Sequence, residues 1–225
     1  MQRRQMMLVL GGSLMLTPAA MTWAAATETD AASGIRLALE RGADAAIAAL
    51  GKTDGFMGNP AVKIELPGYL KDASKLLKMT GQGKRVDELL LAMNRAAEAA
   101  VPAARPLLLN AVKSMSVEDA LQIVKGDDGS VTKFFAGKTR EPLTLQFLPI
   151  VTQATEKLAL ADKYNAVAGK GVGMGLVKAE DANIQQYVTK RALDGLFLMI
   201  AEEERKIRKD PMASGSALLK KVFGG

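Results

Sequence analysis

Hydrophobic residues recur every three or four positions along most of this chain, which is the spacing of helices that each bury one face. The first stripe begins at Ile35 and ends at Leu50, just before Gly51. Later stripes cover residues 69–77, 86–101, 107–115, 119–124, 131–136, 139–158 and 183–209, with a further helix around Tyr164. The pattern predicts a mainly α, single-domain helical bundle.

Two short stretches have a different period. Val62, Ile64 and Leu66 alternate with charged residues inside a long connection that is rich in Gly and Pro. Residues 169–175 carry Gly at every second position, which leaves Val172, Met174 and the following Leu176 on one side of an extended chain. Because alternation is the signature of extended backbone, we expect the two stretches to pair as a small two-stranded β ribbon attached to the bundle.

Capping signals predict where several helices begin. Ser116 followed by Asp119 forms a capping arrangement for a short helix, and a turn follows over residues 126–129. Thr139 is a candidate cap for a helix with Pro142 in its first turn. The last long helix is expected to run from Asn183 to Lys209, because Asp210 and Pro211 stop it.

The first 26 residues have the pattern of an export signal. Arg3 and Arg4 precede an apolar run over residues 6–16, Pro18 breaks it, and residues 24–26 are three alanines suited to cleavage. We expect residues 1–26 to be a cleaved signal peptide, residues 27–225 to form one helical domain, and the protein to work in the periplasm. The arginine pair also fits a twin-arginine signal, so the export route stays open.

Charge and composition limit the partners. The formal net charge is +6 and becomes +4 without Arg3 and Arg4. This mild excess permits contact with a membrane surface, but nucleic acid is not expected, since basic residues alternate with acidic ones and aromatics are few. The remaining candidate partners are an envelope protein and a small ligand.

The residue types that are absent restrict the chemistry. The chain contains no His and no Cys, so the common zinc sites, Ser-His triads and cysteine nucleophiles are excluded in their usual forms. Export without Cys also means no disulfide and no lipid-modified cysteine. We therefore expect no metal and no cofactor, and a non-catalytic role is favoured over an enzyme.

Three segments resemble a known family. They read Gly-Phe-Met-Gly-Asn-Pro-Ala-Val-Lys-Ile-Glu-Leu-Pro-Gly over 55–68, Met-Asn-Arg-Ala-Ala-Glu-Ala-Ala over 93–100, and Tyr-Val-Thr-Lys-Arg-Ala-Leu-Asp-Gly-Leu-Phe over 187–197. The chain resembles a bacterial family catalogued as a domain of unknown function, number four-one-nine-seven, over essentially all of residues 27–225. The resemblance implies an exported protein of Gram-negative type and assigns neither an activity nor functional residues.

The leading hypothesis is a non-catalytic periplasmic binding or envelope-associated protein. Its recognition surface is expected to include the long loop over residues 55–67, where Phe56, Met57 and Asn59 are candidate binding residues, because long irregular loops in compact domains are often functional. Asp194 interrupts an apolar helix and either pairs with Lys190 or Arg191 or acts as an acid or base.

Two other functions stay open. A carboxylate-dependent hydrolase or lyase would need Asp194, Arg95 and Tyr187 to converge in one cleft. A peripheral membrane protein would use its amphipathic C-terminal tail over residues 216–223, although that tail also suits docking on the bundle.

Overall fold

The computed structural model describes residues 19–79, 81, 83–127, 129–156, 159–173, 178 and 181–210. Helices make up most of this part of the chain. They are α1 (Ala19–Leu50), α2 (Gly68–Met79), α3 (Gly83–Ala100), the short 3-10 helix η1 (Val101–Ala104), α4 (Arg105–Lys113), α5 (Val117–Lys125), α6 (Ser130–Thr155), α7 (Ala159–Gly173) and α8 (Ile184–Lys209). The mainly α fold predicted from the apolar stripes is confirmed.

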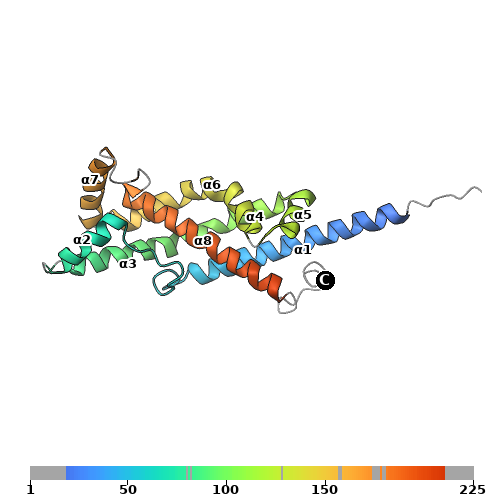
Figure 1. Ribbon diagram of the computed structural model, residues 1–225, viewed down its shortest axis with the longest axis horizontal. Helices are drawn as coiled ribbons and strands as arrows, with labels where there is room; N and C mark the ends of the chain where they lie inside the picture. Colours follow the sequence, from blue (N-terminus) through green and yellow to red (C-terminus); the bar gives the residue numbers. More distant parts are fainter. Residues whose placement is uncertain are drawn as a thin grey trace, which may run out of the picture.

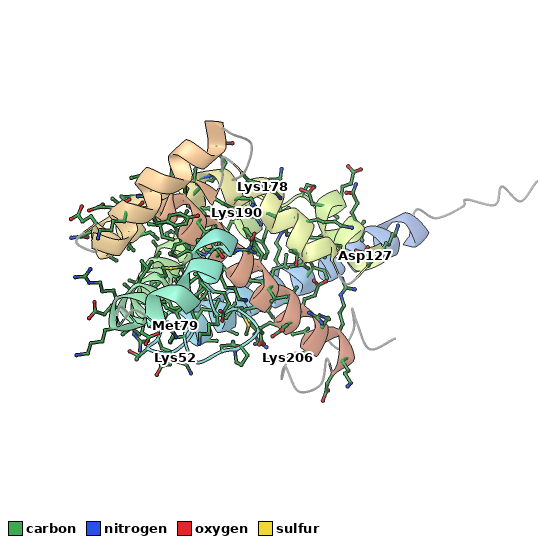
Figure 2. The ribbon with its side chains drawn as sticks, turned by 60° about the vertical axis from the view of Figure 1, so that its left-hand side comes forward. Lys52, Met79, Asp127, Lys178, Lys190 and Lys206 are labelled. Carbon is green, nitrogen blue, oxygen red and sulfur yellow. The ribbon has the colours of Figure 1, made fainter. Side chains whose placement is uncertain are left out.

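The bundle is elongated, and α8 crosses it obliquely (Figure 1). Helix α8 packs against α6, α1 and α3, and α3 also packs against α6. The largest fully buried side chains include Phe56, Phe135, Phe147 and Phe197, which come from the loop after α1, from α6 and from α8. The loop therefore contributes to the core along with the helices.

Several helix boundaries follow the predicted signals. Ser116 and Asp119 form a complete capping box at the start of α5. The side chain of Asn183 accepts hydrogen bonds from the N–H groups of Gln185 and Gln186, which fixes the start of α8. These contacts satisfy backbone donors that a helix N-terminus leaves without partners.

The helix start predicted at Thr139 is wrong. Residues 130–155 form one continuous helix, and the Thr139 hydroxyl donates to the carbonyl of Phe135 one turn earlier, 2.6 Å away. Threonine makes this bond within helices as readily as it caps them, so its presence alone does not mark a start. Pro142 and Pro149 both lie inside α6.

The predicted β ribbon is also wrong, since none of the residues that the structure describes is in a strand. Helix α7 continues to Gly173, so residues 169–173 are helical, while Met174 and Leu176 lie outside the described residues. Residues 63–67 contain no helix, turn or bend, as in an extended chain. The side chain of Asn94, however, occupies the hydrogen-bonding groups of Ile64 that a second strand would need.

The N-terminal part of α1 projects beyond the other helices (Figure 1). Burial is described for residues 32–50 of α1, where Ala32, Ile35 and Leu50 are among the buried residues. In the described part of the chain, no helix combines the length and the apolar character needed to cross a bilayer. The C-terminal tail predicted over residues 216–223 lies outside the described residues.

Candidate functional site

The loop after α1 is held in place by polar side chains of α3. The Asn94 amide accepts a hydrogen bond from the N–H of Ile64 at 2.9 Å and donates one to its carbonyl at 3.0 Å. The same amide donates to the carbonyl of Leu90 at 2.8 Å. Asn94 is fully buried, so these bonds form away from water and fix the backbone of residues 63–65.

Glu98, one turn after Asn94, holds the beginning of the loop. Its Oε1 atom accepts hydrogen bonds from the N–H groups of Phe56 and Met57 at 3.1 and 3.2 Å. Its Oε2 atom accepts from Arg95 Nη1 at 2.6 Å, and Arg95 Nη2 donates to Asp54 at 2.8 Å. The hydrogen bonds to Glu98 and then to Asp54 raise the pKa of Arg95 above its usual value.

Helix α8 holds the loop from a second side. The Tyr187 hydroxyl donates to the carbonyl of Glu65 at 3.0 Å. Two turns further along α8, Gly195 lies so close to the loop that a Cβ added there would approach Phe56 Cε1 to 2.8 Å and Val62 Cβ to 3.3 Å. Because Val62 lies at Gly195 and Glu65 lies at Tyr187, the extended segment runs antiparallel to α8.

Asn59 closes the turn before this segment. Its Oδ1 atom accepts a hydrogen bond from the N–H of Ala61 at 3.1 Å, as in an Asx turn, and its Nδ2 atom lies 3.9 Å from the sulfur of Met199 on α8. The Asn59 carbonyl also accepts from the N–H of Lys63 at 2.8 Å. Asn59 therefore orders the loop through both its side chain and its backbone.

An open cleft of about 320 Å³ lies between residues 61–65 and one face of α8. We call it the α8 cleft. From the loop it is lined by Ala61, Val62, Lys63, Ile64 and Glu65, and from the helix by Tyr187, Arg191, Asp194, Gly195 and Leu198. Its volume is at the lower end of the range for small-molecule sites.

Asp194 takes part in an ion pair across the bundle. Its Oδ1 atom lies 2.8 Å from Arg140 Nη1, and the two side chains are 38% and 42% exposed. The guanidinium of Arg140 also lies over the ring of Phe197, 4.9 Å from its centroid. The partner is thus an arginine of α6 instead of the neighbouring Lys190 or Arg191, and the half-exposed pair is typical of a structural contact.

Arg191 is oriented by an aromatic ring. Its guanidinium carbon lies 5.2 Å from the centroid of Tyr187, one turn earlier on α8. Among the residues that the structure describes, no carboxylate forms an ion pair with Arg191, or with Lys63 across the cleft. The cleft therefore presents two cations that lack a carboxylate partner.

The structure brings together only some of the candidate residues predicted from the sequence. Tyr187 and Asp194 line the α8 cleft, whereas Arg95 does not and is engaged with Glu98 and Asp54. Asp194, Arg95 and Tyr187 therefore do not line one cleft, as the predicted carboxylate-dependent hydrolase or lyase would require. Phe56 is buried under α8, while Met57 is half-buried in the same loop.

The sequence-based prediction of site residues did not include Arg191, Lys63 or Glu65. A helical spacing was available to find Arg191, since Tyr187, Arg191, Asp194 and Leu198 are four, three and four residues apart and share one face of α8. Within the described residues, no group of carboxylates is arranged to hold a metal ion.

The three segments that carry the family resemblance meet at this cleft and the loop beside it. Residues 55–68 are fixed by Asn94 and Glu98 from residues 93–100 and by Tyr187 and Gly195 from residues 187–197. A family model described as a protein of unknown function, DUF4197, matches residues 25–224. No curated protein and no solved structure matches the chain.

Proposed function

The chain belongs to the DUF4197 family of proteins of unknown function, and we propose that it is an exported, non-catalytic binding protein whose partner docks in the α8 cleft. Residues 1–26 have the pattern of an export signal, and the structure contributes the α8 cleft. The cleft brings together a loop held by hydrogen bonds, a helix face and two cations that have no carboxylate partner among the described residues.

The observation that carries the proposal is the way the cleft wall is held. Asn94 and Tyr187 bind the backbone of Ile64 and Glu65, and Glu98 binds the loop further back. The wall is therefore formed before any partner arrives. A preformed site avoids the entropy cost of ordering a loop during binding, which supports a role in recognition.

The export part of the proposal rests on residues 1–26. Packed residues of α1 such as Ala32, Ile35 and Leu39 lie beyond the expected cleavage position. Cleavage after Ala26 would leave these packed residues in the mature protein. Cell fractionation followed by mass spectrometry of the N-terminus tests this: we expect a periplasmic protein that begins near Thr27. A cytoplasmic protein with an intact N-terminus would contradict export.

A cleft-blocking substitution tests the binding role. Ala61 is exposed and lines the cleft, so Ala61→Trp would fill the space without removing the hydrogen bonds that hold the loop. Ala99 is an exposed alanine of α3 outside the cleft, and Ala99→Trp is the matched control. We expect affinity capture from intact cell envelopes to recover a partner with the wild type and the control, and to lose it with Ala61→Trp. Equal recovery with all three proteins would contradict the assignment of the cleft.

A further inference from the structure

The extended segment in the α8 cleft has two backbone edges with different partners. Asn94 occupies both the N–H and the carbonyl of Ile64 on the edge that faces α3. Peptide groups of an extended chain alternate in direction, so the Lys63 carbonyl and the Glu65 N–H point to the opposite edge. That edge faces α8, because the Glu65 carbonyl on the same side accepts the Tyr187 hydroxyl.

Part of this second edge is open. The N–H of Lys63 is bound by Asn59 and the carbonyl of Glu65 by Tyr187. Between them, the Lys63 carbonyl and the Glu65 N–H form no hydrogen bond with the residues that the structure describes. One acceptor and one donor, spaced as on a strand edge, match the N–H and carbonyl of a single residue of an added chain.

The charges of the cleft favour one negative group on the occupant. Arg191 and Lys63 are cationic and Glu65 is anionic, while Asp194 is neutralised by Arg140 behind it. The four charged side chains that line the cleft, Lys63, Glu65, Arg191 and Asp194, sum to zero. Arg140 binds Asp194 from outside the cleft and adds one positive charge, so Lys63 and Arg191 face Glu65 as the remaining carboxylate. The ring of Tyr187 holds the Arg191 guanidinium, and a guanidinium stacked on a ring keeps its N–H donors available at its edge for a carboxylate.

We propose that the α8 cleft binds an extended polypeptide segment, which pairs one residue with the Lys63 carbonyl and the Glu65 N–H and places an acidic side chain against Arg191. This inference rests on the proposed function and names the chemistry of its partner. The main-chain contact covers a single residue, so the acidic side chain supplies most of the selectivity.

Fluorescence polarisation with labelled peptides tests the inference. The protein is expressed from its full chain, including residues 1–26, and is then purified for the measurement. The probe is Thr-Val-Glu-Val-Thr, capped at both ends, and the matched probe has Gln in place of Glu. A set of probes with one N-methylated amide each removes the backbone donors in turn. Arg191→Gln removes the proposed carboxylate partner, and Arg205→Gln is the matched control, because Arg205 is an exposed arginine of the same helix outside the cleft.

Arg191 is exposed, so water screens its attraction for a carboxylate, and we expect the Glu probe to bind about two- to fivefold more tightly than the Gln probe. Arg191→Gln should abolish this difference and Arg205→Gln should preserve it. One N-methylated probe should lose binding while the others keep it. Thermal unfolding of both variants checks that each stays folded.

Three results would overturn the inference. They are equal binding of the Glu and Gln probes, unchanged binding to Arg191→Gln, and equal binding of every N-methylated probe, the last of which would indicate a site for a small carboxylate and not for a chain. Failure of this inference is distinct from failure of the proposed function. If Ala61→Trp still blocks capture of a partner while no probe binds, the cleft is a binding site for another class of ligand.

Discussion

The side-chain amide of Asn94 binds both hydrogen-bonding groups of Ile64, 30 residues away in the sequence. The amide takes the place of a neighbouring strand, so one residue of α3 fixes an extended segment without a β sheet. Asn94 and Ile64 are both buried, and the bonds are shielded from water. The contact determines where the wall of the α8 cleft stands relative to α3.

Replacing Asn94 with Ala should destabilise the protein. The change leaves the N–H and the carbonyl of Ile64 buried without their partner, and each such group costs about 1–3 kcal/mol. We expect a loss of about 2–4 kcal/mol in the free energy of unfolding, measured by urea denaturation. Asn110→Ala, at an exposed position of α4, is the control and should change stability by less than about 0.5 kcal/mol. Equal stabilities of the two variants would contradict a structural role for the amide.

Two glycines in helices should respond oppositely to the same substitution. Gly195→Ala places a methyl group against Phe56 and Val62. The methyl group of Gly137→Ala on α6 would have no packing contact within 4 Å beyond the adjacent backbone of its own helix. Alanine is favoured over glycine in a helix by about 1 kcal/mol, but overpacking costs about 1–3 kcal/mol. We expect Gly137→Ala to raise the melting temperature and Gly195→Ala to lower it. A higher melting temperature for both variants would show that the loop shifts at little energetic cost to accept a methyl group at position 195.

The helix boundaries that the sequence predicts correctly depend on contacts between near neighbours. The capping box of Ser116 and Asp119 and the cap at Asn183 involve residues within three positions of each other, so their spacing reveals them. The prediction at Thr139 fails because its hydroxyl, instead of capping a helix start, donates a hydrogen bond to the carbonyl of Phe135 within the helix. Local patterns decide helix ends only where one hydrogen-bonded arrangement is available.

The site is less predictable than the fold, because its geometry depends on contacts between distant segments. Tyr187 and Asp194 are recognisable as unusual residues on an apolar helix, and both do line the α8 cleft. Glu98 and Arg140 look like ordinary helix-surface residues in the sequence. Glu98 becomes important because the loop passes over α3, and Arg140 because α6 packs on α8. The spacing of residues along the chain predicts neither the contact of the loop with Glu98 nor the contact of α8 with Arg140.

The capping box of α5 makes stability depend on pH. The backbone N–H and then the hydroxyl of Ser116 lower the pKa of Asp119 below its usual value. A lowered pKa in the folded state means that the contribution to stability is present above about pH 4, the unfolded value, and is lost as the pH falls through the folded pKa. We expect Asp119→Asn to be less stable than the wild type at pH 7, with the difference disappearing at acidic pH.

Urea denaturation at a series of pH values measures the Asp119 effect. The control is Glu88→Gln, an exposed carboxylate in the second turn of α3, beyond the first turn in which a side chain caps the helix start. Its difference from the wild type should stay small across the series. A gap between Asp119→Asn and the wild type that persists below the folded pKa of Asp119 would show that the carboxylate charge is not what stabilises the start of α5.

The pair of Asp194 and Arg140 distinguishes a structural carboxylate from a reactive one. Both side chains are partly exposed, so water screens their attraction, and a double-mutant cycle with Asp194→Asn and Arg140→Gln should give a coupling of about 0.2–1 kcal/mol. Arg140→Gln should cost more by itself than Asp194→Asn, because it also removes the contact with the ring of Phe197. A coupling above about 2 kcal/mol would instead require a desolvated, strongly interacting pair. In that case Asp194 would no longer be the mainly structural residue that its exposure and its partner on α6 indicate.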